Sequence, residues 1–408
     1  MLEKGKALKA GGWPSIVGTY AFGVVGVAAV AKVIPLRIEI EQIVGATAAE
    51  YAWLIALLGV PAALFAGISG AVVDRVGPRA VLIASGLIGA FADALYWVAP
   101  SIGGFQAARL VEGVALVGIF SAGPALLMAT TAGRHRIAAM TFWSTYTPTG
   151  FSLGLLLGGA FAGSASWRLT FAIHGCLMML VASIALALPR LPPAPAGHAG
   201  ALGRLRELAG AYRPSAAAAL ALVFFLVISV GFGTSTILPS YVARAHQVTL
   251  AQASRLIAGT NLSMIAGALI VALLLARGAR PRLVMAGLAA GAIACGTALF
   301  WPGTSLRILA PVLCLWFLFM GGGPALLLAV LPRVAEPARR GAAAGLLSQA
   351  SAIATFVNPP LWLALFTAGD WRPLAWLIAA IWVAGTVLLS ALHAVNRPEA
   401  AAVLTAGS

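Results

Sequence analysis

The stretch GAVVDRVGPR, from Gly70 to Arg79, places Asp74, Arg75 and Arg79 within ten residues. The chain around it is 61% hydrophobic and only 9% charged over 408 residues, with a mean hydropathy of +0.98. Soluble globular proteins have an apolar content of ~45–50%, so this composition excludes that class. The charged stretch is therefore a short loop between two long apolar segments.

Apolar runs of about twenty residues, the length that crosses a ~30 Å hydrocarbon core as a helix, recur along the chain. Because lipid offers no partner to backbone polar groups, such runs must be helical. The sequence predicts an all-α membrane protein with twelve spans. They lie near 14–35, 48–71, 80–98, 105–130, 137–163, 169–188, 215–242, 251–276, 283–301, 308–331, 341–366 and 374–393.

The stretch 189–214 is rich in Pro, Gly and Arg, which is typical of a solvated linker. It divides the spans into two sets of six. The predicted organisation is a cytoplasmic segment at 1–13, a six-helix bundle at 14–188, the linker at 189–214, a second six-helix bundle at 215–393 and a cytoplasmic tail at 394–408.

The two halves repeat each other. GPALLMA at 123–129 returns as GPALLLA at 323–329, and Trp167-Arg168 returns as Trp371-Arg372. Matches at nearly the same offset, in equivalent spans, favour duplication of a six-span unit. Parallel repeats of this kind are one plan for secondary transporters, with the substrate site between the halves.

The formal charge of +15 is distributed by membrane side. With a cytoplasmic N-terminus, eighteen Lys and Arg residues fall on the cytoplasmic side and six on the other. This positive-inside bias predicts that both termini and the linker are cytoplasmic, in the inner membrane of the cell. The charge therefore indicates topology in a lipid bilayer and not a nucleic-acid partner.

No pattern in the sequence predicts an enzyme. Cys176, Cys295 and Cys314 fall inside spans at no metal-ligand spacing, so neither a disulfide nor a metal site is expected. The chain has no phosphate-binding loop and no nucleophile motif, and no cofactor is expected. A gradient must then supply the energy for transport.

The opening stretch resembles the loop signature between spans two and three of the major facilitator superfamily. Gly70, Asp74, Arg75, Gly77 and Arg79 match that signature, and Pro78 replaces one of its basic residues. The resemblance implies two six-helix bundles that alternate between inward-open and outward-open states. It also implies that Asp74 latches the start of span eleven and favours the outward-open state. The alternative is that Arg75 and Arg79 only obey the positive-inside rule.

Two further elements carry the resemblance. Arg109, Glu112 and Gly113 match a family element of span four. The glycine ladder of span five, typical of antiporters in the family, is matched by four helix-packing glycines, although Leu155 stands where its proline is usual. These are Gly150, Gly154, Gly158 and Gly159.

Charges inside spans are few, and each costs at least ~2.5–3.5 kcal/mol at the bilayer centre. Asp93 in span three and Arg109 in span four reach comparable depths, which predicts an ion pair, with Glu112 one turn from Arg109. Asp93, Arg109 and Glu112 are the candidates for proton coupling. The alternative is a permanent structural ion pair.

Other polar and aromatic residues are candidates for a substrate cavity. Lys32 is a candidate whose alternative is a side chain that extends to the membrane surface. His174 is either a buried, hydrogen-bonded histidine or a proton or substrate ligand. Pro359-Pro360 is expected to break span eleven. The remaining cavity candidates are Trp143, Tyr146, Phe224, Phe225, Asn261, Gln349 and Asn358.

These observations predict a monomeric, proton-coupled secondary transporter of a small organic molecule. Export of an amphipathic compound by proton antiport is favoured over the alternative, uptake of a small organic anion that meets Lys32 or Arg109. A membrane sensor that binds without transporting is the alternative from another class.

Overall fold

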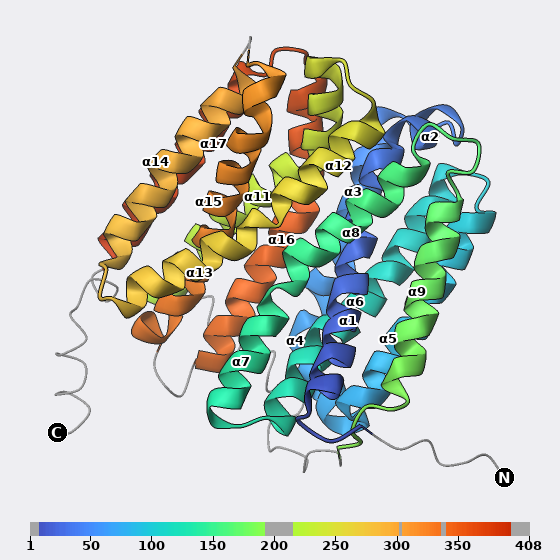
Figure 1. Ribbon diagram of the computed structural model, residues 1–408, viewed down its shortest axis with the longest axis vertical. Helices are drawn as coiled ribbons and strands as arrows, with labels where there is room; N and C mark the ends of the chain where they lie inside the picture. The colour runs from blue at the N-terminus through green and yellow to red at the C-terminus, as the bar shows by residue number, and fades with distance from the viewer. Residues whose placement is uncertain (1–7, 192–214, 302–303, 336–339, 393–408) are drawn as a thin grey trace. The chain divides into compact units, whose positions relative to one another are not determined.

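The computed structural model of the chain describes residues 8–191, 215–301, 304–335 and 340–392 (Figure 1). Every regular element in these residues is a helix, which confirms the predicted all-α class. Before residue 192 the elements are α1 (Trp13–Ala31), the 3-10 helix η1 (Ile34–Leu36), α2 (Arg37–Gln42), α3 (Ala48–Leu57), α4 (Gly59–Val76), α5 (Pro78–Val98), α6 (Ile102–Thr130), α7 (Gly133–Ser144), α8 (Tyr146–Phe161) and α9 (Leu169–Ala185). After residue 214 they are α11 (Ala216–His246), α12 (Leu250–Asn261), α13 (Ser263–Ala276), α14 (Pro281–Phe300), α15 (Leu306–Val334), α16 (Arg340–Thr367) and α17 (Arg372–Ala391).

Ten helices or helix pairs in the described residues are long and apolar enough to cross a membrane. The two other predicted spans have shorter helices. The span expected at 137–163 is divided at Thr145 into α7 and α8, and the span expected at 169–188 contains α9, which has 17 residues. At the division the Thr145 hydroxyl donates to the Phe142 carbonyl at 2.8 Å, so the interruption is hydrogen-bonded locally.

The expected break at Pro359-Pro360 is wrong, because α16 continues through both prolines. The side chain of Asn358, just before the prolines, forms three hydrogen bonds. Its Nδ2 donates to the Ala354 carbonyl at 2.6 Å and to Ser229 Oγ at 3.0 Å, and its Oδ1 accepts from Trp362 Nε1 at 3.0 Å. These bonds brace the helix on both sides of the prolines, where ring nitrogens cannot donate.

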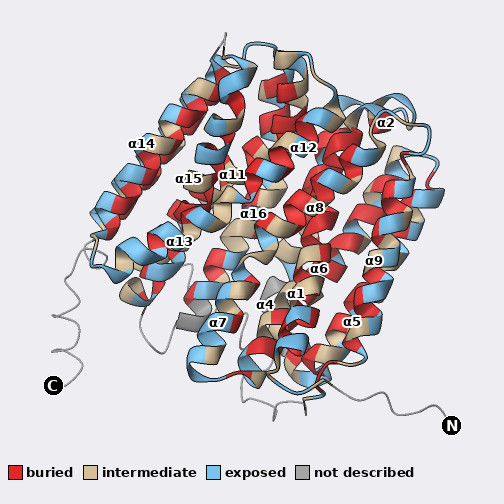
Figure 2. Ribbon diagram, viewed as in Figure 1, coloured by how far each residue is buried: buried red, intermediate tan, exposed pale blue. Residues whose placement is uncertain are grey.

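The chain forms two compact units. One contains Met1–Leu205 and Thr236–Gly259, and the other contains Arg206–Ser235 and Thr260–Ser408. The predicted division into two six-helix halves stays a prediction. In the first unit, buried side chains such as Phe22, Leu82, Leu116 and Met178 form a core among α1, α5, α6 and α9. Buried residues lie along one side of many of these helices, and exposed ones along another (Figure 2).

Three of the four predicted ladder glycines pack α8 against the backbone of α1. A Cβ atom at any of the three would overlap a carbonyl oxygen of the facing segment, so only glycine allows this approach. The facing pairs are Gly150 with Val24, Gly154 with Ala28, and Gly158 with Lys32. We call this contact the α1–α8 seam. The fourth glycine, Gly159, faces Ser254.

The seam predicts that Gly154→Ala destabilises the protein by about 1–3 kcal/mol, the usual cost of overpacking a well-packed core. The added methyl group would meet the Ala28 carbonyl and, at 2.8 Å, the Cβ of Ala31. Thermal unfolding of the purified protein measures the loss. Leu156→Ala, on the exposed side of α8, is the control and should unfold close to the wild type. Equal unfolding temperatures for wild type and Gly154→Ala would show that the seam is not tight.

Candidate functional site

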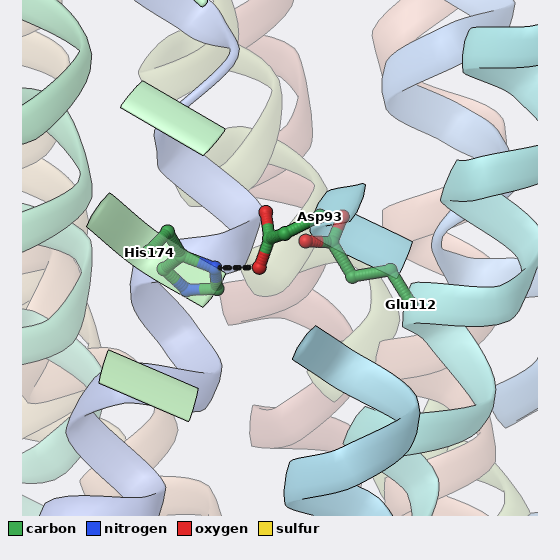
Figure 3. Close-up of side chains that lie close together, drawn as sticks. All are labelled: Asp93, Glu112 and His174. Atoms are coloured by element: carbon green, nitrogen blue, oxygen red, sulfur yellow. Dashed lines mark hydrogen bonds and ion pairs between the residues drawn. The ribbon is translucent and has the colours of Figure 1, made fainter. Parts of the chain in front are cut away.

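Five ionisable side chains lie together inside the first unit, and each is at most 1% exposed. Lys32 follows the last residue of α1, Asp93 lies on α5, Arg109 and Glu112 lie on α6, and His174 lies on α9. We call these five residues the buried ion network. Figure 3 shows Asp93, Glu112 and His174 pointing toward one another from three different helices.

The ammonium group of Lys32 stands at the centre of the network. Its Nζ forms ion pairs with Asp93 Oδ1 and, at 2.6 Å, with Glu112 Oε1. It also lies 2.9 Å from His174 Nδ1. The rings of Tyr96 and Phe171 lie 5.2 and 5.5 Å from Nζ, within the range of a cation–π contact. One cation therefore contacts side chains from α5, α6 and α9.

Arg109 holds the other oxygen of Glu112. Its Nη1 is 2.7 Å from Glu112 Oε2, one helical turn away, and the Tyr96 hydroxyl donates to the same oxygen at 3.1 Å. The guanidinium also donates to three backbone carbonyls. These belong to Leu54 at 3.2 Å, Ala29 at 2.8 Å and Val30 at 3.0 Å. The planar fork of arginine thus joins α6 to α1 and α3.

His174 contacts hydrogen-bond acceptors with both ring nitrogens. Nε2 lies 3.0 Å from the Val25 carbonyl, which can only accept, so Nε2 carries a hydrogen. Nδ1 lies 2.6 Å from Asp93 Oδ2. The same Nδ1 lies 2.9 Å from Lys32 Nζ. A hydrogen on Nδ1 would donate to Asp93, and an Nδ1 without one would accept from Lys32. Nδ1 therefore has a hydrogen-bond partner whether or not it carries a hydrogen.

The fixed charges of the network balance. Lys32 and Arg109 carry two positive charges, and Asp93 and Glu112 carry two negative ones. Burying an unpaired charge costs several kcal/mol, whereas paired and hydrogen-bonded charges are tolerated. With a neutral His174 ring the network is neutral, and a protonated ring would give it one positive charge.

Sequence reasoning found the members of the network but not all of its pairs. The predicted neighbours Arg109 and Glu112 are ion-paired. The predicted Asp93–Arg109 pair is wrong, because Asp93 pairs with Lys32 and His174. Lys32 does not extend to the membrane surface, since it is fully buried. Matching depths along two helices could not reveal which faces the helices turn to each other.

Three residues of the network are of the types that bind metal ions in proteins. One donor atom each from Asp93, Glu112 and His174 lies within 4.8 Å of the others. The ammonium of Lys32 contacts all three side chains, so a metal ion would have to displace a cation that the chain itself supplies. The expectation that no metal binds stays a prediction.

The charged loop of the opening stretch separates α4 from α5. Gly77 ends α4 with φ +89°, a backbone conformation that favours glycine. Arg79 donates to the Leu188 carbonyl at 3.0 Å and to the Leu186 carbonyl, just beyond the end of α9. Gly70 and Asp74 are half-buried and Arg75 is exposed. The start of span eleven, which the resemblance pairs with Asp74, falls partly outside the described residues.

Sequence reasoning missed the contacts of Arg168. This side chain donates to the carbonyls of Tyr96 at 2.9 Å, Trp97 at 2.7 Å and Ala99 at 2.8 Å, at the end of α5. Its position after Trp167 was the only signal, through the repeat at Trp371-Arg372. The repeat differs in its contacts, because Arg372 pairs with Asp370 at 3.0 Å, and the hydrogen bonds lower the pKa of the Asp370 carboxyl.

The other cavity candidates are divided between the two units. Trp143 and Tyr146 lie side by side in the first unit, with ring centroids 4.6 Å apart. Those in the second unit are Phe224, Phe225, Asn261, Gln349 and Asn358. Asn358 is occupied by the bonds that brace α16.

Comparison with known proteins places the chain in a family. The profile of the Major Facilitator Superfamily matches residues 16–322 and 220–408. A curated relative from Pyricularia oryzae, MFS-type transporter 1, is 34% identical over 145 residues, which are 34% of this chain and 22% of the relative. The chain thus spans less than a quarter of that relative's length.

Two solved structures share the fold. A variant of the nucleoside transporter NupG has a TM-score of 0.74 at 13% identity, over 93% of this chain and 100% of that one. A bacterial homologue of the human lysosomal transporter Spinster, inward-facing and unoccupied, has a TM-score of 0.65 at 17% identity, over 94% and 95%. The match of the family profile across the chain shows that this protein belongs to the Major Facilitator Superfamily, and the two solved structures share its fold.

Proposed function

We propose that this protein is a proton-coupled secondary transporter and moves a small organic solute by alternating access between two six-helix halves. The observation that carries the proposal is the position of His174 Nδ1, 2.6 Å from Asp93 Oδ2 and 2.9 Å from Lys32 Nζ, which offers a partner to a protonated and to an unprotonated ring. A proton bound there adds a positive charge to a buried network that is neutral without it. Binding is therefore opposed by desolvation, which favours release when the site is buried and uptake when the site becomes hydrated. A proton that binds and leaves in this way can couple a gradient to a change of state.

Export by proton antiport is favoured over uptake of an organic anion. In the anion alternative, the solute's carboxylate meets Lys32 or Arg109. Both cations are fully buried and already bind carboxylates of the chain, so an anion would have to displace Glu112 or Asp93. The glycine ladder, which the resemblance associates with antiporters, supports the same direction. The nucleoside specificity of one structural neighbour is not carried over, because their identity is 13%.

The test of coupling first needs a transported solute. A thermal-shift screen of the purified protein against metabolites and drugs supplies one, because a ligand at about 100 times its Kd adds about 2.7 kcal/mol of stability. Asp93→Asn should then abolish accumulation driven by a pH gradient in proteoliposomes. Binding and exchange without a gradient should persist, because exchange needs only reorientation of the loaded carrier.

The matched control is Asp370→Asn, which removes an exposed carboxylate outside the spans. It should accumulate solute like the wild type. The coupling role would be excluded if three variants all accumulated solute normally and with normal pH dependence. These variants are Asp93→Asn, Glu112→Gln and His174→Gln, and the network would then be purely structural.

Arg109→Ala should strongly destabilise the protein. Removing one partner of a buried ion pair costs about 3–5 kcal/mol, and here three carbonyls also lose their donor. The loss of a positive charge beside Glu112 favours its protonated form, so the pH profile of transport should move upward. Arg109→Lys should rescue only part of the stability, because one ammonium cannot reach all four acceptors. Full rescue by lysine, measured by thermal unfolding and by the pH profile, would contradict the geometry.

We infer from the loop signature that Asp74 sets the balance between the two open states. Asp74→Asn should leave folding intact and reduce transport, with the resting population shifted toward the inward-open state. Accessibility of single cysteines to a membrane-impermeant reagent on each side measures that shift. Asp74→Glu, which keeps the charge, is the control. An unchanged accessibility pattern together with wild-type transport in Asp74→Asn would exclude the role.

A further inference from the structure

A second buried carboxyl group lies outside the buried ion network. Glu39, on α2, is only 4% exposed. Its Oε1 accepts a hydrogen bond from the backbone N–H of Gly163. Its Oε2 is also buried and has no hydrogen-bond partner. A fully ionised carboxylate has two acceptor oxygens, and here only one of them is satisfied.

The helix next to this carboxyl group does not favour a negative charge. Gly163 follows the end of α8, with φ +77°. The carbonyl end of a helix is the negative end of its dipole, which stabilises cations and not anions. The Gly163 N–H is therefore the donor on which Glu39 depends at this position.

The charged groups around Glu39 have partners of their own. On α2, Arg37 is ion-paired with Glu41 at 2.7 Å and lies 5.6 Å from the centre of the Tyr51 ring. On α3, Glu50 forms a capping box with Thr47. Neither η1 nor the stretch 158–164 contains a titratable side chain. Arg37, two residues from Glu39 in the sequence, is ion-paired with Glu41.

Burial favours the neutral carboxyl group. Moving an isolated ionised carboxylate out of water costs far more than moving a neutral polar group, for which about 2–7 kcal/mol is typical. We propose that Glu39 binds a proton when it docks against the end of α8, which makes the contact a second proton site and a pH-sensitive latch. This inference does not rest on the proposed function, because it concerns different residues and needs no transported solute.

The latch lies at one end of the α1–α8 seam. Gly158 is the last seam glycine, and a Cβ there would meet the Lys32 carbonyl and, at 3.0 Å, the ring of Pro35. The Glu39–Gly163 contact follows at the end of the same pair of segments. As the pH rises, Glu39 loses its proton, the buried form becomes unfavourable, and this end of the seam opens. Protonation closes it.

Infrared spectroscopy tests the proton directly. The C=O stretch of a protonated carboxyl group is separate from the bands of carboxylates, so a pH titration of the purified wild-type protein shows which groups lose protons. We expect one protonated-carboxyl band that Glu39→Gln removes and that Glu41→Gln and Asp93→Asn retain. Glu41 is the matched control, since it lies two residues away and is paired with Arg37. A spectrum that Glu39→Gln leaves unchanged would overturn the proton site.

Hydrogen–deuterium exchange at the Gly163 amide tests the latch. Glutamine keeps an acceptor for that amide, so exchange in Glu39→Gln should stay slow at every pH after correction for the intrinsic rate. In Glu39→Ala it should be at least about tenfold faster at every pH, which corresponds to about 1.4 kcal/mol. The wild type should change from the slow rate to the fast rate as the pH rises. Two results for the wild type would overturn the latch. One is slow exchange of the Gly163 amide at every pH, and the other is exchange as fast as in Glu39→Ala at every pH. Thermal unfolding of each variant confirms that it is folded.

Discussion

Charges inside a membrane protein have to be neutralised by one another, and the first unit of this protein is arranged around that constraint. The ammonium of Lys32 contacts Asp93, Glu112 and His174, and Arg109 completes the balance of charge. Removing any one charge would leave another buried and unpaired, at a cost of about 3–5 kcal/mol. The four helices that carry these residues are thereby held at a fixed rotation about their axes. In the proposed function, this site, which is costly to disturb by mutation, takes up and releases one proton, and its two forms differ by a single charge.

The antiparallel helices α5 and α9 are joined at three levels. Arg79, at the start of α5, binds carbonyls beyond the end of α9, and Arg168, just before α9, binds carbonyls at the end of α5. Each arginine places positive charge at the negative end of the neighbouring helix, which is a stabilising arrangement. Asp93 and His174 join the same two helices between these ends. The charged loop motif thus has a structural role in the first unit in addition to its proposed role in the transport cycle.

The sequence was sufficient for features that depend on one helix at a time. Apolar runs predict the spans, and the spacing of three residues predicts the Arg109–Glu112 pair. Features that depend on the rotation of one helix against another were not predictable, and the partner of Asp93 is the clearest example. A local rule also failed at Pro359 and Pro360, because α16 continues through both prolines. The burial of Glu39 had no signal, because a carboxylate in a short polar helix usually faces water.

The proposed proton site at the Asp93–His174 pair is the central claim, and nitrogen-15 NMR of the His174 ring tests it most directly. The assigned ring signals of the purified protein, followed through a pH titration, report the hydrogen on each nitrogen separately. The account predicts that Nε2 keeps its hydrogen throughout, because the Val25 carbonyl accepts it, and that Nδ1 shows a single titration that is altered in Asp93→Asn. An Nε2 without a hydrogen, or an Nδ1 signal that does not change across the titration, would contradict the account.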